Sequence, residues 1–390
     1  MLLSSDDFRA RARNYLPRFV FDYVDGGAED ERCLQRNKSD LEMLNLVPTC
    51  LRDTSRMDCG VEVFGQRWSA PIGVAPLGFC GLVRPRGDLF LARAAASLGL
   101  PSVLSTASNS RLEAVREAAL NASPNAEQWI QLYVMYDRKI AERILRRAAA
   151  VGFGALVLTV DVPVSGYRER DVRNGFSFPF RPSLRTFIDL ASRPQWTLAM
   201  ARSVLESGLP SFVNLSGSDH ADACAQAQGA LFHRSTDRTL AWDSLAWLRQ
   251  VWKGPLLIKG VLNHEDAIRS VQHGVDGLIV SNHGGRQLDA APSTISVLPG
   301  IVDVTFGRIP VFVDSGFRRG SDVTKALALG AQAVFVGRHA LWGLAAGGEH
   351  GAQLALKLLA DEVERTMALV GASSIGDLKP THLWNKSVAR

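Results

Sequence analysis

The sequence predicts an α/β fold, a (β/α)8 barrel of the TIM type, on two observations. From about residue 70 onward, eight β-branched apolar runs alternate with alanine- and leucine-rich stretches of helical period, which is typical of parallel strands joined by helices. No G-x-G-x-x-G follows the first run, which disfavours an open dinucleotide-binding sheet. Eight such units favour a closed barrel. The expected strands cover residues 70–78, 101–106, 128–134, 155–161, 254–260, 276–284, 309–316 and 333–338.

Helices are expected between these strands. GDLFLARAAASLG, HEDAIRSVQHG and GSDVTKALALG each end on a glycine, the residue that most easily adopts the left-handed conformation after a helix. Residues 1–69 precede the first strand and are expected to form an N-terminal segment packed on the barrel. We therefore expect residues 1–390 to form a single barrel domain.

A long insertion follows the fourth expected strand. About 80 residues separate Asp161 from the helix WDSLAWLRQVW before the fifth strand, and connections of that length are usually functional or disordered. Phenylalanine, tryptophan and arginine are concentrated in it, mainly over residues 176–217, where LRTFIDLA and QWTLAMARSVLE look weakly amphipathic. Between Arg168 and Arg202, seven arginines stand against three acids, so most of the chain's net charge of +5 is local.

Composition narrows the class of protein. With 390 residues, 46% of them hydrophobic, the chain can bury the core of one large barrel. The net charge of +5 comes without a nucleic-acid-binding motif, so no nucleic acid is expected as a partner. Five cysteines without a C-x-x-C pair suggest neither a disulfide framework nor a metal site and fit a reducing cytosol. No run of 18 apolar residues predicts a membrane-spanning helix, and the N-terminus does not read as a secretory signal.

The segment SNHGGRQLD carries the sharpest chemical signal. In a (β/α)8 barrel, reactive groups lie at the carboxyl ends of the strands, and His283 leaves the sixth strand just before two glycines. Arg286 follows three residues later, which places a base beside an anion clamp. A carboxylate held by Arg286 and by a second arginine such as Arg168 would lie near the imidazole, which Asp161 could orient. The other strand ends are also unusually polar, with Gln131, Tyr133, Thr159, Lys259, Ser281 and Asp314.

A phosphate site is predicted after the last two strands. DSGFRRGSD and the Gly337-Arg338 pair supply glycines, free backbone N–H groups and arginines where barrels bind phosphate. Arg318 and Arg338 are the natural partners of the phosphate. Together with Lys259, a cation that could stabilise an anionic reduced ring, a phosphate-bearing cofactor would make this a redox site.

These residues resemble the FMN-dependent L-2-hydroxy acid dehydrogenase and oxidase family, which includes glycolate oxidase and the lactate and mandelate dehydrogenases. The likeness runs along essentially the whole chain and includes FDYVDGGAEDE, APLG, LSTAS, QLYV, LTVDVP, YRERD, IKG, SNHGGRQLD, VDSGFRRGSDV and VGR. Within the family, LSTASN, GYRERD and DSGFRRGSD are most similar to the bacterial (S)-mandelate dehydrogenase branch.

The resemblance implies a role for each site residue. His283 would be the catalytic base paired with Asp161, and Arg286 and Arg168 would bind the substrate carboxylate. Ala107 takes a place where glycolate oxidases carry a bulky tryptophan, which would leave room for a phenyl ring. Tyr23 and Tyr133 would help to hold the substrate. FMN would be held by Pro76, Leu77, Gly78, Ser105, Gln131, Thr159, Lys259 and Ser281, and its phosphate by Asp314, Gly316, Arg318, Gly337 and Arg338.

The expected function is FMN-dependent oxidation of (S)-mandelate to benzoylformate. The insertion falls where membrane-bound relatives carry a membrane-binding segment, so a peripheral protein on the cytoplasmic side of the inner membrane is expected, passing electrons to quinone. The family also implies a homotetramer. Three alternatives stay open: an L-lactate dehydrogenase or related 2-hydroxy acid oxidase, a non-redox phosphate-binding barrel lyase or isomerase, and an insertion that serves as an active-site lid or subunit contact.

Overall fold

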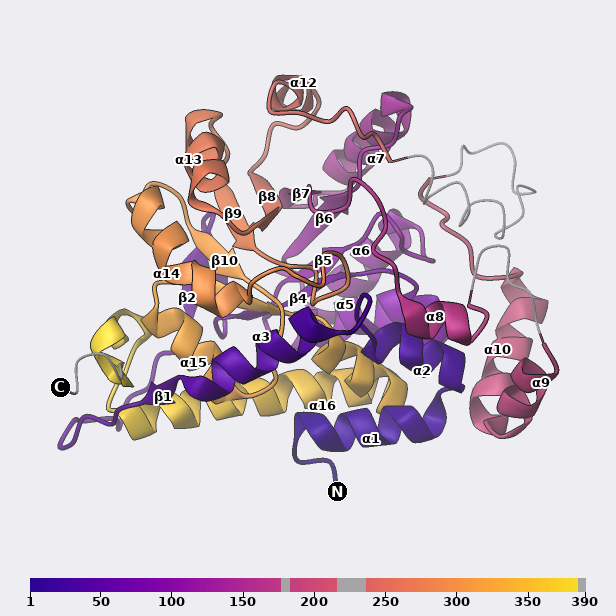
Figure 1. The fold of residues 1–390 in the computed structure, drawn as a ribbon, viewed down its shortest axis with the longest axis horizontal. Coiled ribbons are helices and arrows are strands. Elements are labelled where there is room, and N and C mark those ends of the chain that lie inside the picture. Colours follow the sequence, from indigo (N-terminus) through magenta and orange to yellow (C-terminus); the bar gives the residue numbers. More distant parts are fainter. Residues whose placement is uncertain (177–182, 216–235, 385–390) are drawn as a thin grey trace.

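The core of the molecule is a closed barrel of eight parallel strands (Figure 1). The computed structural model describes residues 1–176, 183–215 and 236–384. Strands follow one another around the barrel in chain order, and the last pairs with the first, Val334 beside Ile72. The predicted barrel and all eight predicted strands are confirmed. The strands are β4 (Ile72–Leu77), β5 (Ser102–Leu104), β6 (Gln128–Leu132), β7 (Ala155–Thr159), β8 (Leu256–Val261), β9 (Gly277–Val280), β10 (Val311–Val313) and β11 (Ala333–Val336).

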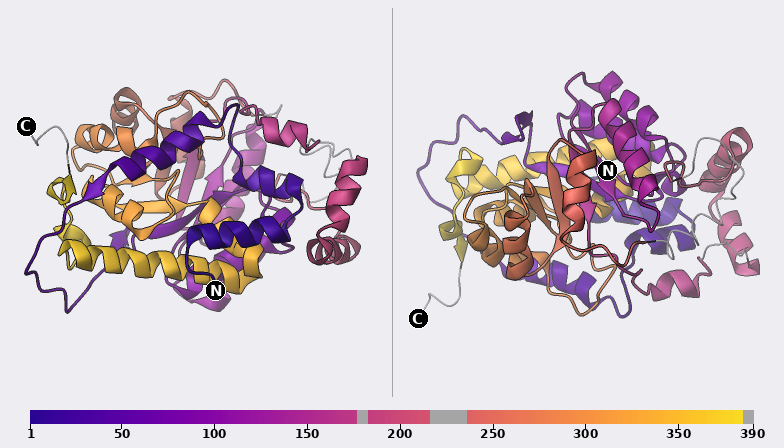
Figure 2. Two further views of the ribbon diagram at one scale, coloured as in Figure 1. Left: turned by 60° about the horizontal axis from the view of Figure 1, so that its bottom comes forward. Right: turned by 90° about the horizontal axis from the view of Figure 1, so that it is seen from above.

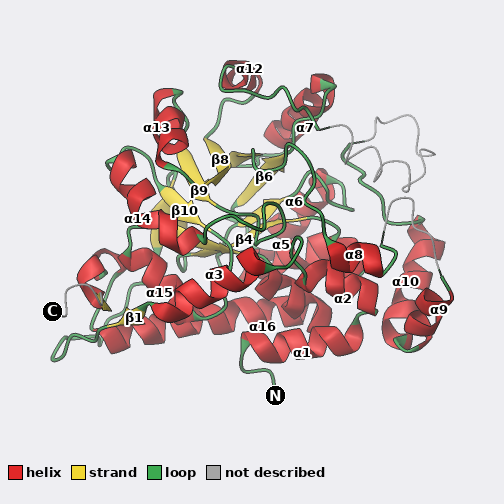
Figure 3. Cartoon of the chain, in the orientation of Figure 1, coloured by secondary structure: helices red, strands yellow, loops and turns green. Residues whose placement is uncertain are grey.

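Helices surround the barrel (Figure 3). Each predicted glycine ending is present, because Gly99, Gly274 and Gly330 follow α5, α13 and α15 with φ of 65°, 68° and 95°. At the other end, the Asn263 side chain caps α13 by accepting a hydrogen bond from the backbone of Asp266 at 2.8 Å. The helices between and after the strands are α4 (Cys80–Val83), α5 (Gly87–Ser97), α6 (Leu112–Ala122), α7 (Arg138–Ala150), α12 (Ser244–Val251), α13 (His264–Gln272), α14 (Thr294–Thr305), α15 (Gly320–Ala328) and α16 (Arg338–Val370).

A hairpin closes the amino-terminal end of the barrel. Its strands, β2 (Val61–Val63) and β3 (Gln66–Trp68), place the buried Trp68 inside an apolar cluster with inward-facing side chains of the barrel strands. The ring centroid of Trp68 lies 5.5 Å from that of Trp129 and 6.1 Å from that of Phe312. Because this end is filled with aromatic rings, a ligand can enter only from the opposite end.

The N-terminal segment packs on the barrel as predicted. Helices α1 (Ser5–Tyr15), α2 (Arg18–Asp25) and α3 (Arg32–Met43) wrap one side, and α1 runs beside α16 in the views of Figures 1 and 2. After the third helix, β1 (Asn45–Leu46) pairs antiparallel with β12 (Leu383–Trp384) near the end of the described chain, where two 3-10 turns, Ile375–Asp377 and Pro380–His382, precede it. The connection between α2 and α3 lies at the carboxyl ends of the barrel strands.

The insertion after β7 contains both predicted amphipathic helices. Following α8 (Glu169–Arg173), they are α9 (Leu184–Ala191) and α10 (Pro194–Ser207), which stand out to one side of the barrel (Figures 1 and 2). Trp196 attaches them to the rest of the molecule, because its indole N–H donates to the Leu82 carbonyl at 3.0 Å and its ring meets Phe19 edge-on. Phe178, Phe180 and residues 216–235 lie outside the described residues.

The described cysteines, Cys33, Cys50, Cys59 and Cys80, are free thiols, and Cys224 lies outside the described residues. Within residues 1–176, 183–215 and 236–384, no three His, Cys, Asp or Glu side chains are grouped so that they could hold a metal ion.

Candidate active site

A deep cleft opens at the carboxyl ends of the barrel strands. It encloses about 1560 Å³, its open mouth included, and side chains from the N-terminal segment and the insertion complete its walls. Most of the predicted site residues line it directly. They are Tyr23, Pro76, Leu77, Gly78, Ser105, Ala107, Tyr133, Thr159, Arg168, Lys259, His283, Arg286, Asp314, Gly316, Arg318, Gly337 and Arg338.

Three predicted site residues, Gln131, Asp161 and Ser281, lie behind this lining and support it. The Gln131 side chain donates to the Thr159 hydroxyl and accepts from the Ser105 hydroxyl, both at 3.1 Å. Gln131 is fully buried, so these two hydrogen bonds fix the hydroxyls that face the cleft. Asp161 and Ser281 support their neighbours in the same way, as described below.

His283 lies at the exit of β9 in a backbone conformation that is rare for a residue with a side chain. Its φ is 59°, and Gly284 and Gly285 follow at 68° and 72°. Few residues other than glycine adopt the left-handed region, although histidine does so more readily than most, and such conformations collect at functional sites. The imidazole Nδ1 lies 3.0 Å from Asp161 Oδ1, and Nε2 lies 3.4 Å from the Tyr133 hydroxyl.

The charge of Asp161 determines which histidine nitrogen carries the proton. Burial would raise the pKa of Asp161, but its interaction with His283 and the charge of Lys259 outweigh burial and hold that pKa below its ordinary value. An ionised Asp161 accepts hydrogen bonds only, so Nδ1 carries the hydrogen and Nε2 is the free base. Burial raises the pKa of Tyr133 well above its ordinary value, so its hydroxyl stays protonated beside Nε2.

Two arginines face the cleft next to this base. Arg286 is fixed by hydrogen bonds from Nη1 to the Tyr23 carbonyl at 2.6 Å and the Gly26 carbonyl at 3.1 Å. Arg168 Nε lies 2.8 Å from Asp171 Oδ2, and both guanidinium groups stand over the Tyr23 ring, at 5.6 Å and 4.9 Å from its centroid. Burial and the charge of Arg168 lower the pKa of Arg286. Two cations this close together favour an anion between them, and a carboxylate matches their geometry.

Lys259 is a buried cation near the end of β8, the strand next to β9. Its Nζ donates to the Ser281 hydroxyl at 2.7 Å and lies 3.1 Å from Asp314 Oδ2. Burial works against the charged form, but the carboxylates of Asp314 and Asp161 outweigh it and raise the pKa of Lys259. The Ser281 hydroxyl also accepts from the His283 backbone N–H at 3.1 Å, so Ser281 connects the cation to the base.

The far end of the cleft is cationic. Burial lowers the pKa of Arg338 to about 9 and that of Arg318 as well, which indicates buried cations with too few anions around them. Arg338 is held by hydrogen bonds to the Val24 carbonyl at 3.2 Å and the Gly26 carbonyl at 2.7 Å. Gly316 has a φ of 98°, and a Cβ there would come within 2.8 Å of the Asn37 carbonyl, so only glycine fits.

These features fit FMN. A phosphate at the cationic end would supply the negative charge that Arg318 and Arg338 lack. A flat ring at the other end would meet the Ser105 and Thr159 hydroxyls and the Lys259 ammonium, which are donors and acceptors of the kind that a flavin edge requires. The cleft lies at the face of the barrel where such cofactors bind.

Several cleft residues were missed from the sequence. Phe79 directly follows the predicted Gly78, so its place at a strand exit could have indicated it. Gln287 belongs to the motif of His283 and Arg286, and its side-chain amide donates to the Asp161 carbonyl at 3.0 Å, joining the two catalytic loops. No pattern pointed to Phe212 of the insertion, which reaches the cleft only through the fold.

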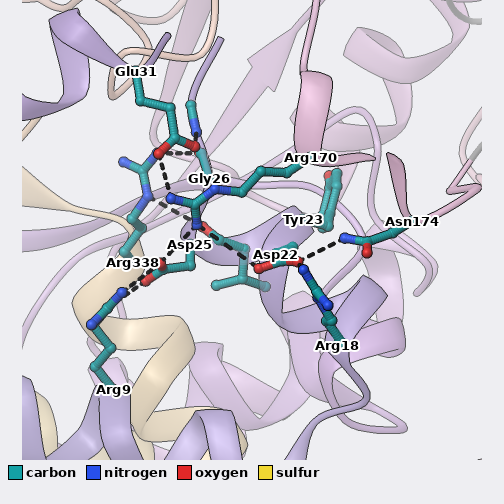
Figure 4. A network of polar contacts seen from close by, with 12 residues as sticks. Arg9, Arg18, Asp22, Tyr23, Asp25, Gly26, Glu31, Arg170, Asn174 and Arg338 are labelled. Carbon is teal, nitrogen blue, oxygen red and sulfur yellow. Dashed lines mark hydrogen bonds and ion pairs between the residues drawn. The ribbon is translucent and has the colours of Figure 1, made fainter. Parts of the chain in front are cut away.

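An ion-pair cluster anchors α8, the helix that Arg168 caps, to the N-terminal segment (Figure 4). Arg170 contacts Glu31, and its Nη1 lies 3.3 Å from Asp25 Oδ2. Arg9 donates two hydrogen bonds to Asp25, at 2.6 and 2.7 Å. The Asp25 carboxylate is buried, so these bonds are shielded from solvent. The cluster fixes the position of Arg168 relative to Tyr23.

Comparison with known proteins agrees with this site. The sequence model of the FMN-dependent dehydrogenases matches residues 12–385. The (S)-mandelate dehydrogenase of Pseudomonas putida is 43% identical over 387 residues, covering 99% of this chain and 95% of that protein. The L-lactate dehydrogenase of Ectopseudomonas mendocina is 40% identical over 383 residues, covering 97% of each chain.

Solved structures show the same relationship. The crystal structure of a monotopic membrane protein, (S)-mandelate dehydrogenase, superposes with a TM-score of 0.92 at 43% identity and covers 99% of this chain and 100% of that one. A mandelate oxidase with (S)-4-hydroxymandelic acid gives a TM-score of 0.82 at 36% identity, covering 98% of each chain. The chain therefore belongs to the FMN-dependent dehydrogenase family and is an FMN-dependent 2-hydroxy acid dehydrogenase.

Proposed function

We propose that this enzyme oxidises (S)-mandelate to benzoylformate. The observation that carries the proposal is the small-residue wall beside the arginine pair: a Cβ at Gly78 would lie 3.2 Å from the Ala107 methyl and 3.8 Å from the Tyr23 hydroxyl. With no bulky side chain at Gly78 or Ala107, the substituent on the α-carbon can be as large as phenyl. Relatives named for mandelate support this choice. Those named for L-lactate make lactate the second candidate.

In this proposal the substrate carboxylate lies between Arg168 and Arg286. That pairing fixes the α-carbon and its hydroxyl near His283 Nε2, which accepts the proton that leaves the substrate. Asp161 stabilises the imidazolium that forms, because its carboxylate already faces Nδ1–H. The protonated Tyr133 hydroxyl donates a hydrogen bond to the substrate oxygen. All of these groups are on strand exits or adjoining turns, which are rigid enough to hold this geometry.

When bound, FMN would accept the two electrons and the second of the two hydrogens that the substrate loses, the first having passed to His283 as a proton. In our proposal Lys259 faces the FMN ring and favours a negative charge there, while Ser105 and Thr159 bond to its edge. Gln131 and Ser281 act from behind by fixing Thr159 and Lys259. The backbone of Pro76, Leu77 and Gly78 would border the ring, and Gly316, Arg318, Gly337 and Arg338 would hold the phosphate. The Asp314 carboxylate, which lies 3.1 Å from Lys259, would accept hydrogen bonds from the ribityl hydroxyls instead.

Replacing Arg170 with methionine should weaken substrate binding without disabling the chemistry. The buried Asp25 and the neighbouring Glu31 would lose a partly exposed partner, which lowers the free energy of unfolding by about 1 kcal/mol. Because Arg168 caps the helix that Arg170 anchors, we expect KM to rise about tenfold, while kcat stays within about threefold. Steady-state kinetics and denaturant unfolding measure both effects. Arg173→Met, which removes an exposed pair with Glu169 on the same helix, is the control and should change neither.

We also propose that α9 and α10 attach the enzyme to a membrane surface. None of the described helices is long and apolar enough to cross a bilayer. On these two helices and the residue pair after them, however, six large apolar side chains are more than half exposed: Leu184, Phe187, Ile188, Leu198, Leu205 and Leu209. Such a face would enter the headgroup boundary of an anionic membrane. We place the attachment on the cytoplasmic side of the cell membrane, with quinone as the electron acceptor and a homotetramer as the assembly.

The double variant Leu198→Ser/Leu205→Ser tests this attachment. Leu198 and Leu205 are 71% and 89% exposed, and burying each in a membrane is worth about 1.5–3 kcal/mol, so binding to anionic vesicles should fall by about 10²- to 10⁴-fold. Activity with a soluble dye acceptor should not change. Phe306→Ser/Leu369→Ser removes equally exposed apolar side chains outside the insertion, 79% and 69%, and serves as the control. Equal losses in the two double variants would contradict a specific membrane surface.

The substrate is tested by mixing the FMN-loaded enzyme anaerobically with (S)-mandelate or L-lactate and following loss of the flavin absorption. Fast bleaching by mandelate and slow bleaching by lactate is the expected result. The reverse order would transfer the proposal to L-lactate, and bleaching by neither would exclude both substrates.

A further inference from the structure

Phe212 and Phe79 form a separate apolar cluster at the wall of the cleft. Phe79, Ala107 and Phe212 are buried together, with Tyr23, Leu82 and Leu215 packed around them. This cluster is separate from the main core and from the filled floor of the barrel. The Phe79 and Phe212 ring centroids are 4.5 Å apart at an angle of 60°, and the Tyr23 ring meets Phe79 edge-on at 5.7 Å. The cluster lines the same cleft as the base and the arginine pair.

The position of Phe212 is fixed, although it belongs to the insertion. Asn109, in the loop that carries Ala107, donates from its side chain to the Ser211 carbonyl at 3.0 Å. The Asn214 side chain donates to the Ser110 carbonyl at 2.9 Å and accepts from the Leu112 backbone at 3.1 Å, so it caps the start of α6. Two asparagines thus join residues 211–214 to the loop after β5, and Phe212 between them is directed into the cleft.

The chemistry of the site indicates which part of the substrate the wall formed by Phe79 and Phe212 contacts. With the carboxylate between the two arginines and the proton acceptor on one side, the remaining substituent of the α-carbon must lie on the side of Gly78 and Ala107. The wall beyond Ala107 is Phe79 and Phe212. Aromatic rings prefer edge-to-face and offset contacts with other rings at centroid distances of about 4.5–7 Å, the range that these rings already show among themselves. A methyl group at the same place would make fewer contacts with these rings and would offer them no aromatic edge or face.

We propose that Phe212 is a specificity-determining residue that forms, with Phe79, the subsite for the aryl group of the substrate. This inference rests on the proposed function, since it names the part of the chain that selects an aryl over an alkyl 2-hydroxy acid. One consequence is that the insertion has two separate roles. Its helices α9 and α10 present apolar residues outward, while residues 211–214 complete the substrate pocket.

The test compares Phe212→Ala and Phe212→Leu with the wild type on (S)-mandelate and L-lactate. Loss of the ring should lower kcat/KM for mandelate by about 10- to 50-fold in Phe212→Ala, while kcat/KM for lactate changes by less than about threefold. Phe212→Leu keeps apolar volume, so its kcat/KM for mandelate should lie between those of the wild type and Phe212→Ala. Phe187→Ala is the matched control, because Phe187 is a phenylalanine of the same insertion, 59% exposed and outside the cleft, and its loss should leave the ratio unchanged.

A binding measurement separates selection from damage to the fold. Phenylacetate has no hydroxyl to oxidise, so its effect on the flavin spectrum reports affinity alone; Phe212→Ala should weaken phenylacetate binding about tenfold and leave propionate binding unchanged. If the wild type prefers mandelate and Phe212→Ala keeps the same ratio, or loses both substrates and both acids in parallel, the assignment of Phe212 is wrong and the proposed function stands. A wild type that oxidises only L-lactate would overturn both proposals.

Discussion

Replacing His283 with asparagine is expected to lower kcat for the 2-hydroxy acid by about 10³- to 10⁴-fold, with FMN still bound. Asparagine is the better replacement because residue 283 has a φ of 59°, which asparagine tolerates more readily than alanine. The loss follows from geometry, because Nε2 is the only nitrogen of the ring that Asp161 leaves free. The other bases of the described cleft wall are engaged elsewhere: Asp314 pairs with Lys259, and both ring nitrogens of His339 lie within hydrogen-bond distance of Ser5 and the Ala355 carbonyl.

Single-turnover reduction of the flavin measures this effect directly, since it excludes later electron transfer. His350→Asn, on the exposed side of α16, should behave like the wild type. The rate of flavin reduction in Asp161→Asn should lie between those of the wild type and His283→Asn, because the imidazole remains but loses the charge that stabilises its protonated form. A His283→Asn variant that keeps the wild-type rate and shows an isotope effect with α-deuterated substrate would mean that proton transfer does not depend on His283.

The barrel and much of the cleft could be predicted because the residues at the end of each strand can be recognised from the local sequence. An apolar run that leads to a polar residue, as at Thr159 at the end of β7 and at Lys259 near the end of β8, places that residue toward the open end of a barrel whichever helices follow. The motif of His283 and Arg286 lies within four residues, so one turn brings the base and the clamp together. Asp161 and His283 meet because β7, β8 and β9 are neighbours in the barrel.

Contacts between distant segments could not be predicted in the same way. Phe212 is held at the cleft by hydrogen bonds of Asn109 and Asn214. No spacing in the sequence indicates that the segment around Phe212 contacts the loop of Asn109. Arg170 was counted only as one charge in a basic stretch, yet it is an internal ion-pair partner of Asp25 and Glu31. Local charge shows where a residue could form pairs, whereas the partner depends on tertiary packing.

The variant Arg168→Met is expected to raise KM for the substrate by about 10²- to 10³-fold, through two effects that act in the same direction. The carboxylate loses charge-assisted hydrogen bonds, which contribute about 1.5–3 kcal/mol each. Asp171, which faces Arg168 Nε at 2.8 Å, also remains as a buried anion near the substrate carboxylate. Substrate binding from stopped-flow reduction measures the sum of the two.

The pH dependence of KM in Arg168→Met separates the loss of hydrogen bonds from the repulsion by Asp171. Burial already raises the pKa of Asp171, and the Arg168 charge opposes that increase, so the pKa must rise further when the arginine is removed. At a given pH, Asp171 is therefore protonated to a larger extent in Arg168→Met than in the wild type. As pH falls, its repulsion of the substrate disappears, and KM of Arg168→Met should fall more than that of the wild type. Adding Asp171→Asn to Arg168→Met should remove the pH dependence of KM. It should also lower KM at every pH by the amount that repulsion from Asp171 had raised it. If the double variant binds no better than Arg168→Met, Asp171 does not oppose the substrate, and the lost hydrogen bonds account for the whole effect.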